Sequence, residues 1–137
     1  MKFNLKDLDP TALRARAYYE AVLIDSNPAQ AKGRSFNEIL TTCMYGQAAE
    51  LYMLTQGFTD DLRAYKDVIR PDGVPAEVKV TECEAYVPYV LKRCNAAAFE
   101  KWRKYSHFLY IWINDKKSFE YTLYGIYEWN GKEFVVL

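Results

Sequence analysis

The chain has 137 residues, half of them hydrophobic and 16% aromatic, which suits one well-packed domain and is too short for two ordinary ones. Eighteen basic residues balance eighteen acidic residues, so the formal net charge is zero and the chain has no strong overall positive potential that would attract a polyanion. A single histidine and three cysteines without a Cys-x-x-Cys pair exclude a structural zinc site, and no apolar run reaches the roughly 20 residues that span a bilayer. We therefore expect a single soluble, cytoplasmic domain over residues 1–137, with no membrane partner.

Residues 1–34 predict a helix followed by a loop. Asp9 before Pro10 is typical of a helix N-cap and first helical position, and the Ala-, Leu- and Arg-rich segment 11–24 favours a helix. The Ser-Asn-Pro cluster at residues 26–28 then indicates that a loop leads to the second helix.

A longer helix is predicted over residues 36–56. Ser35 and Glu38 have the spacing of a capping box, and Gly57 follows where a C-terminal cap would lie. On a helical wheel one arc is apolar and contains Ile39, Leu40, Cys43, Met44, Leu51 and Leu54. Glu50 lies inside this arc. A buried carboxylate is costly unless it is paired or binds a metal, so Glu50 is a candidate third acid that reaches toward the hairpin. The alternative is that the apolar arc ends before Glu50, which then lies at the core margin near solvent or pairs with an arginine.

A β-hairpin is predicted about Asp72, because Pro71-Asp72-Gly73 is typical of a turn between two apolar runs. Asp67 and Glu77 are equally far from Asp72 along the chain, so we expect them to lie opposite each other. Glu77 and Lys79 share one face of their strand, because side chains alternate between faces. Opposed carboxylates are destabilising without a cation between them, which makes Lys79 and a divalent metal ion the candidates.

Residues 85–105 predict a third helix, which tolerates Pro88 in its first turn. On the wheel one face of this helix is apolar and the other is basic. Basic side chains can neutralise backbone phosphates, so a nucleic-acid-binding surface is expected at Lys92, Arg93, Lys101, Arg103 and Lys104. A solvated helix face without a partner is the alternative for each of these side chains.

Strands are predicted for the rest of the chain. Residues 107–113 form a continuous apolar run that is typical of a buried strand, and the C-terminal segment 114–137 predicts a hairpin. Its two β-prone runs, 119–129 and 133–137, are joined by the turn signal Asn130-Gly131. The order of the elements favours an α/β fold with a central mixed β-sheet flanked by α-helices.

The motifs between residues 35 and 113 resemble the PD-(D/E)xK nuclease superfamily. The resemblance lies in an acid on a helix, Glu50, an acid in the first strand of a hairpin, Asp67, and the motif Glu77-Val78-Lys79 in the second strand. A helix and an apolar strand follow, as in that family. The resemblance implies a restriction endonuclease-like core over residues 35–113.

It also implies a role for each residue. Asp67 and Glu77 would bind Mg²⁺ or Mn²⁺ with the Val78 carbonyl as a further ligand, and these hard oxygen donors suit such an ion. Lys79 would position the attacking water, and Glu50 would be an auxiliary catalytic acid. The implied function is a small metal-dependent endonuclease that hydrolyses phosphodiester bonds in DNA.

DNA is thus the expected partner, with branched and single-stranded DNA among its forms. Because the chain is small, we also expect a homodimer or a larger complex that selects the substrate. Two alternatives stay open. One is a non-catalytic nucleic-acid- or protein-binding module on the same fold, and the other is an RNA-directed nuclease with the same site.

Overall fold

The computed structural model describes residues 1–60, 67–96 and 107–137. The helices in these ranges are α1 (Pro10–Asp25), α2 (Pro28–Ala31), α3 (Phe36–Thr55) and α4 (Val87–Cys94). The strands are β1 (Lys2–Asn4), β2 (Thr59–Asp60), β3 (Val68–Ile69), β4 (Pro75–Thr81), β5 (Phe108–Asp115), β6 (Glu120–Trp129) and β7 (Phe134–Val136). Short 3₁₀ turns precede α1 and α4.

The described strands form one mixed sheet in the order β1-β6-β5-β4-β3-β2, with β7 also paired to β6. Strands β4 and β5 are parallel, with Glu77 beside Leu109 and Lys79 beside Ile111, whereas the other described pairs are antiparallel. A parallel pair needs a crossover connection, and α4 lies in that connection. The structure therefore confirms a mixed α/β fold with a central sheet.

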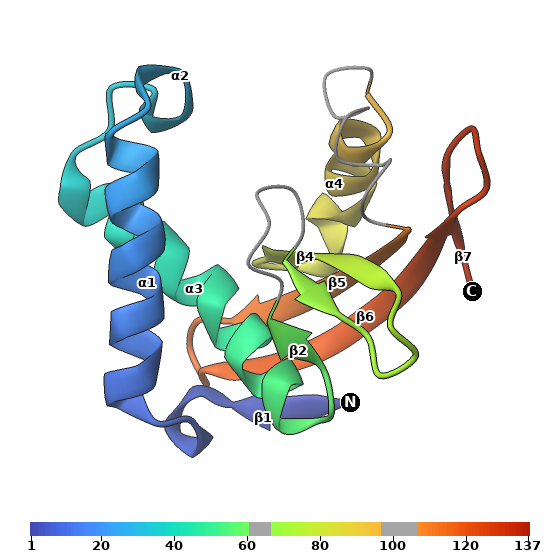
Figure 1. Cartoon of the computed structure of the whole chain (residues 1–137), viewed down its shortest axis with the longest axis horizontal. Helices are drawn as coiled ribbons and strands as arrows, with labels where there is room; N and C mark the ends of the chain where they lie inside the picture. Colours follow the sequence, from blue (N-terminus) through green and yellow to red (C-terminus); the bar gives the residue numbers. More distant parts are fainter. Residues whose placement is uncertain (61–66, 97–106) are drawn as a thin grey trace.

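Helices cover both faces of the sheet (Figure 1). Helix α3 packs on the face that carries Val78, Tyr110 and Trp112. Helix α4 packs on the opposite face, against Leu109 and Ile111. Helix α1 packs along α3 through small residues, and Figure 1 shows these two helices together on the side of the molecule away from α4. The alternation of residues along β4 and β5 thus separates two cores.

The predicted hairpin about Asp72 is confirmed. Val68 pairs with Ala76 and Ile69 with Pro75, so the register is centred on residue 72. The Arg70 amide donates to the Val74 carbonyl over 2.9 Å. Gly73 has φ +86°, a conformation that glycine adopts without steric cost. The turn residues therefore set the register that places Asp67 opposite the Glu77 end of β4.

The predicted helix starts are also confirmed. The Asp9 carboxylate accepts from the Thr11 amide at the start of α1, and Ser35 and Glu38 form the predicted capping box at the start of α3. The first 34 residues additionally contain β1 and α2, which the sequence analysis did not predict. Strand β1 pairs with β6 near the other end of the chain, so no local pattern marks it.

The structure confirms a helix within the predicted range 85–105, but in the described residues this helix is shorter than predicted and spans Val87–Cys94. A 3₁₀ turn occupies Glu84–Tyr86, and the α-helix ends at Cys94. The Asn95 side chain accepts a hydrogen bond of 2.8 Å from the Phe134 amide, which ties the end of α4 to β7. Asparagine competes for local hydrogen bonds and favours helix ends. Residues 97–105 of the predicted helix lie outside the described residues.

Gly46 supports a stability prediction, because it lies in the middle of α3 and a Cβ added there meets no atom within 4 Å. Mid-helix glycine costs about 0.5–1 kcal/mol relative to alanine. We expect Gly46→Ala to raise the free energy of unfolding by about this amount, measured by urea denaturation. Gly57→Ala is the control and should lower it, because Gly57 has φ +94°. A lower free energy for Gly46→Ala would contradict the expectation.

Candidate active site

The acid predicted in the first strand of the hairpin lies where β3 begins. The Asp67 amide donates to the Ala76 carbonyl over 3.3 Å, and the Asp67 carboxylate accepts from the Val78 amide over 2.7 Å. A side chain thus takes the place of a backbone acceptor beside β4. The carboxylate is held against the backbone of Val78, next to Glu77.

Lys79 forms an ion pair with Glu77, with 3.3 Å between Nζ and Oε1. The Glu77 side chain is 15% exposed and that of Lys79 is 34% exposed, so water screens this pair only in part. Burial disfavours the charged form of Lys79, but the carboxylates of Glu77 and Asp67 outweigh it and raise the pKa of this lysine. Lys79 is therefore an ammonium at neutral pH and a donor of hydrogen bonds.

The helix acid Glu50 is 7% exposed. Burial, followed by the nearby charges of Asp67 and Glu20, raises its pKa well above the usual value. Glu50 therefore faces the hairpin, as its place in the apolar arc of α3 predicts. The arginine alternative is present as well, because an Arg16 guanidinium nitrogen lies 3.8 Å from Glu50 Oε1.

Asp67 shares this environment. Burial and the Glu77 carboxylate raise the pKa of Asp67 well above its usual value, against the opposing effects of Lys79 and the Val78 amide. The structure thus brings Glu50, Asp67, Glu77 and Lys79 within electrostatic reach of one another, from one helix and two neighbouring segments of the sheet. The three carboxyl groups outnumber the one ammonium group, Lys79.

Two further charged residues of the site come from α1. Arg16 donates through Nε to Gln47 over 2.9 Å and pairs with Asp60 at 2.9 Å. Gln47 donates to Glu20 over 2.6 Å, and Glu20 acts on the pKa of both acids described above. The sequence alone does not orient the arginines of α1, and Glu20 is not among the residues that it predicts. The spacing of four residues between Arg16 and Glu20, which places them on one face of α1, was the available signal.

The residues present fit a hard divalent cation. The donors are the carboxylates of Asp67 and Glu77 and the carbonyl of Val78, a set that leaves positions for water and phosphate oxygens, as Mg²⁺ prefers. A divalent cation would also relieve the excess of negative charge that raises the pKa of Asp67. Within residues 1–60, 67–96 and 107–137, no group of three His, Cys, Asp or Glu side chains forms a ready-made metal cage.

The predicted nucleic-acid-binding residues are described only in part. Lys92 and Arg93 lie exposed at the end of α4. Arg93 borders a small hollow of about 120 Å³ together with Lys79 and Cys94, so it lies beside the site. The other three predicted residues, Lys101, Arg103 and Lys104, lie outside the described residues.

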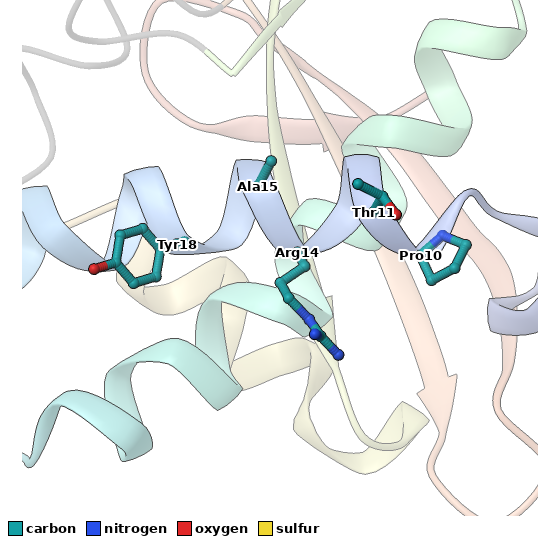
Figure 2. Close-up of a pocket in the computed structure, with 5 residues that line it drawn as sticks. All are labelled: Pro10, Thr11, Arg14, Ala15 and Tyr18. Carbon is teal, nitrogen blue, oxygen red and sulfur yellow. The ribbon is translucent and has the colours of Figure 1, made fainter.

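Two other features do not supply the chemistry of this site. Burial raises the pKa of the Cys43 thiol to about 12 and also raises that of Cys94, so neither is an activated thiolate at neutral pH. A surface hollow of about 570 Å³ lies along α1, and Figure 2 shows its lining from Pro10 to Tyr18. That lining contains none of the four candidate residues.

Comparison of the chain with protein-family models, with curated proteins and with solved structures finds no match. None of the helices in the described ranges is both long and apolar enough to cross a membrane. The function is therefore argued from the chemistry of the residues in the site.

The raised pKa of Asp67 gives a stability prediction. The folded state prefers the protonated carboxyl, so ionisation costs folding free energy as the pH rises above the usual value of 3.8. Asp67→Asn removes this cost and keeps an acceptor for the Val78 amide. In metal-free buffer we expect the variant to be more stable than the wild type at about pH 8, with the difference shrinking toward about pH 4. Urea denaturation over a pH series measures this.

The same variant tests for a cation. Adding Mg²⁺ or Mn²⁺ should raise the melting temperature of the wild type and leave that of Asp67→Asn unchanged, because binding to the folded state alone is stabilising. Asp72→Asn is the matched control, since Asp72 lies in the turn and pairs with Arg70 at 3.2 Å. It should respond as the wild type does. An equal response of all three proteins would contradict a metal ion at Asp67.

Proposed function

We propose that the protein is a metal-dependent nuclease with a restriction endonuclease-like core of the PD-(D/E)xK type, which hydrolyses phosphodiester bonds in DNA. The observation that carries the proposal is the gathering of four charged groups around β4: Lys79 pairs with Glu77 at 3.3 Å, the Val78 amide holds Asp67 at 2.7 Å, and the charge of Glu77 acts on the pKa values of Glu50, Asp67 and Lys79. Ionisable groups with perturbed pKa values gather at functional sites. The same four residues form the sequence pattern that predicts this chemistry.

The two strand acids provide the place for the cation. Asp67, Glu77 and the Val78 carbonyl would hold Mg²⁺ or Mn²⁺, which lowers the pKa of a bound water and neutralises charge on the phosphate. The hydrogen bond from the Val78 amide fixes the Asp67 carboxylate before any ligand arrives. This preorganisation lowers the cost of ordering the site.

Lys79 and Glu50 have different tasks because their charges differ. Lys79 carries a proton that its neighbours hold firmly, so it orients the attacking water and stabilises negative charge on the phosphoryl oxygens. Burial and the neighbouring carboxylates raise the pKa of Glu50, which favours its protonated form and makes it the candidate general acid or base of the site. The exposed side chains of Lys92 and Arg93 would contact phosphates beyond the cleaved bond.

Lys79→Met and Asp67→Asn test the catalytic roles. Each should lower metal-dependent cleavage of single-stranded or branched DNA by about 100-fold or more, because each removes an interaction with developing charge. Gel assays measure cleavage, and circular dichroism checks the fold. The controls Lys132→Met and Asp72→Asn, both in turns, should cut within about twofold of the wild type. Undiminished cutting by both site variants would contradict the mechanism, and cutting of RNA in place of DNA would reassign the substrate.

Arg93→Ala tests the phosphate contact. We expect weaker DNA binding and a fall of about one in the slope of log affinity against log salt concentration, because one released counterion is lost. Fluorescence anisotropy in metal-free buffer measures both values without cleavage. Arg14→Ala is the matched control, since Arg14 is an exposed arginine on α1. Equal salt slopes for both variants would contradict a contact at Arg93.

A further inference from the structure

A groove of about 430 Å³ opens beside the candidate active site, between α3 and the ends of β4 and β5. Val78 and Lys79 line it, so it adjoins the residues proposed for catalysis. Gly46 contributes to the wall on α3, and Asn114 and Lys116 contribute from the end of β5 and beyond. The groove and the candidate site therefore meet along β4, at Val78 and Lys79.

Asn114 is the first sign that the groove takes a ligand. It is 2% exposed, and its Oδ1 atom is buried with no hydrogen bond from any described residue. Leaving a buried amide oxygen unpaired costs free energy, and most such groups in proteins have a partner. Asn114 lies on the α3 side of the sheet with Trp112, and it is one of the residues that line the groove. A ligand with a hydrogen-bond donor would satisfy it.

Gly46 is the second sign. A glycine in the middle of a 20-residue helix lowers its stability, and no neighbouring atom lies within 4 Å to require the missing side chain. Close packing therefore does not explain this residue. Its effect is to keep the α3 wall of the groove free of a side chain, opposite the β-strands that carry Asn114.

The charges of the groove indicate which part of a nucleic acid it accepts. Glu20 and Glu82 line it, and Lys116 donates to Glu82 over 2.6 Å while lying 4.7 Å from the Tyr45 ring. Lys79 is likewise paired with Glu77. Acids with paired cations disfavour a phosphate inside the groove. A flat, uncharged group with hydrogen-bonding edges fits the groove better, and a nucleobase is such a group.

The distance to the site suits a nucleotide that lies a few positions from the cleaved bond. Lys79 pairs with Ile111, and Asn114 lies three residues further along β5, or about 10 Å at the usual rise of a strand. This is about three nucleotide steps of roughly 3.4 Å. The buried amide lies too deep for the edge of a base that is paired and stacked in a duplex. Only an unstacked base can enter, as in other pockets that bind extruded or single-stranded bases.

We propose that the groove binds one unpaired nucleobase of the substrate strand through hydrogen bonds to the Asn114 amide. This inference rests on the proposed function only in that the substrate strand lies at the candidate active site. It deepens that function by assigning single-stranded or branched nucleic acid as the substrate class. Residues of α3 and β5 would thus distinguish unpaired from paired substrate, and these residues are not the ones that would bind the metal ion.

The test compares two single-stranded DNA oligonucleotides of equal length, one ordinary and one abasic at every position. Both carry the same phosphates, so the ratio of their affinities isolates the bases. In metal-free buffer we expect the wild type to bind the ordinary strand about tenfold more tightly, by fluorescence anisotropy. Asn114→Leu and Gly46→Phe should reduce this ratio to about one, because the first removes the amide and the second fills the groove.

Three measurements separate binding from folding and from catalysis. Asn114→Leu should melt at or above the wild-type temperature, because it removes an unpaired buried oxygen. Gly46→Ala, the small matched variant, should keep the ratio of affinities. Asp67→Asn should keep the ratio while losing cleavage, because Asp67 does not line the groove.

A ratio of about one in the wild type would overturn the proposal, as would an unchanged ratio in both Asn114→Leu and Gly46→Phe, which would leave the amide with a structural role only. Cleavage without base-dependent binding would overturn the groove assignment and leave the nuclease proposal standing. Base-dependent binding without cleavage of any DNA would support the groove and overturn the nuclease.

Discussion

The site depends on one hydrogen bond, from the Val78 amide to the Asp67 carboxylate over 2.7 Å. It substitutes a side chain for a backbone acceptor, so the regular pairing of β3 with β4 stops at Val68. An acid is thereby held beside the strand that carries Glu77. The helix acid Glu50, which lies within the apolar arc of α3, is close enough to both acids for their charges to raise its pKa.

This arrangement lowers stability in exchange for chemistry. Burial and mutual repulsion raise the pKa values of Glu50 and Asp67, so their ionised forms are costly in the folded protein. Arg16 does not remove the excess negative charge, because its guanidinium group also contacts Gln47 and Asp60 in addition to Glu50. A purely structural network would satisfy its charges more fully. The unbalanced negative charge is the reason to expect a bound cation there.

Local signals predicted the parts of the fold that local physics determines. The capping box at Ser35 and the turn at Gly73 marked a helix start and a hairpin register, and strand alternation put Glu77 and Lys79 on one face. Long-range contacts determine the rest. The end of α4 depends on a bond to β7, and the burial of Asn114 depends on α3 lying over β5. Neither leaves a periodic trace in the sequence.

Helix α3 connects the two functions assigned to this face of the molecule. Gly46 and Glu50 are four residues apart, so they lie one turn from each other on the same side of the helix. The acid faces the proposed cleavage site, and the gap left by the glycine faces the groove. A nucleic-acid strand that runs along α3 would first meet the charged residues proposed for catalysis. It would then meet the groove, where the Asn114 amide offers hydrogen bonds to a base. One helix would thus position the cleaved bond and also contribute to the groove that accepts a nearby base only when this base is unpaired.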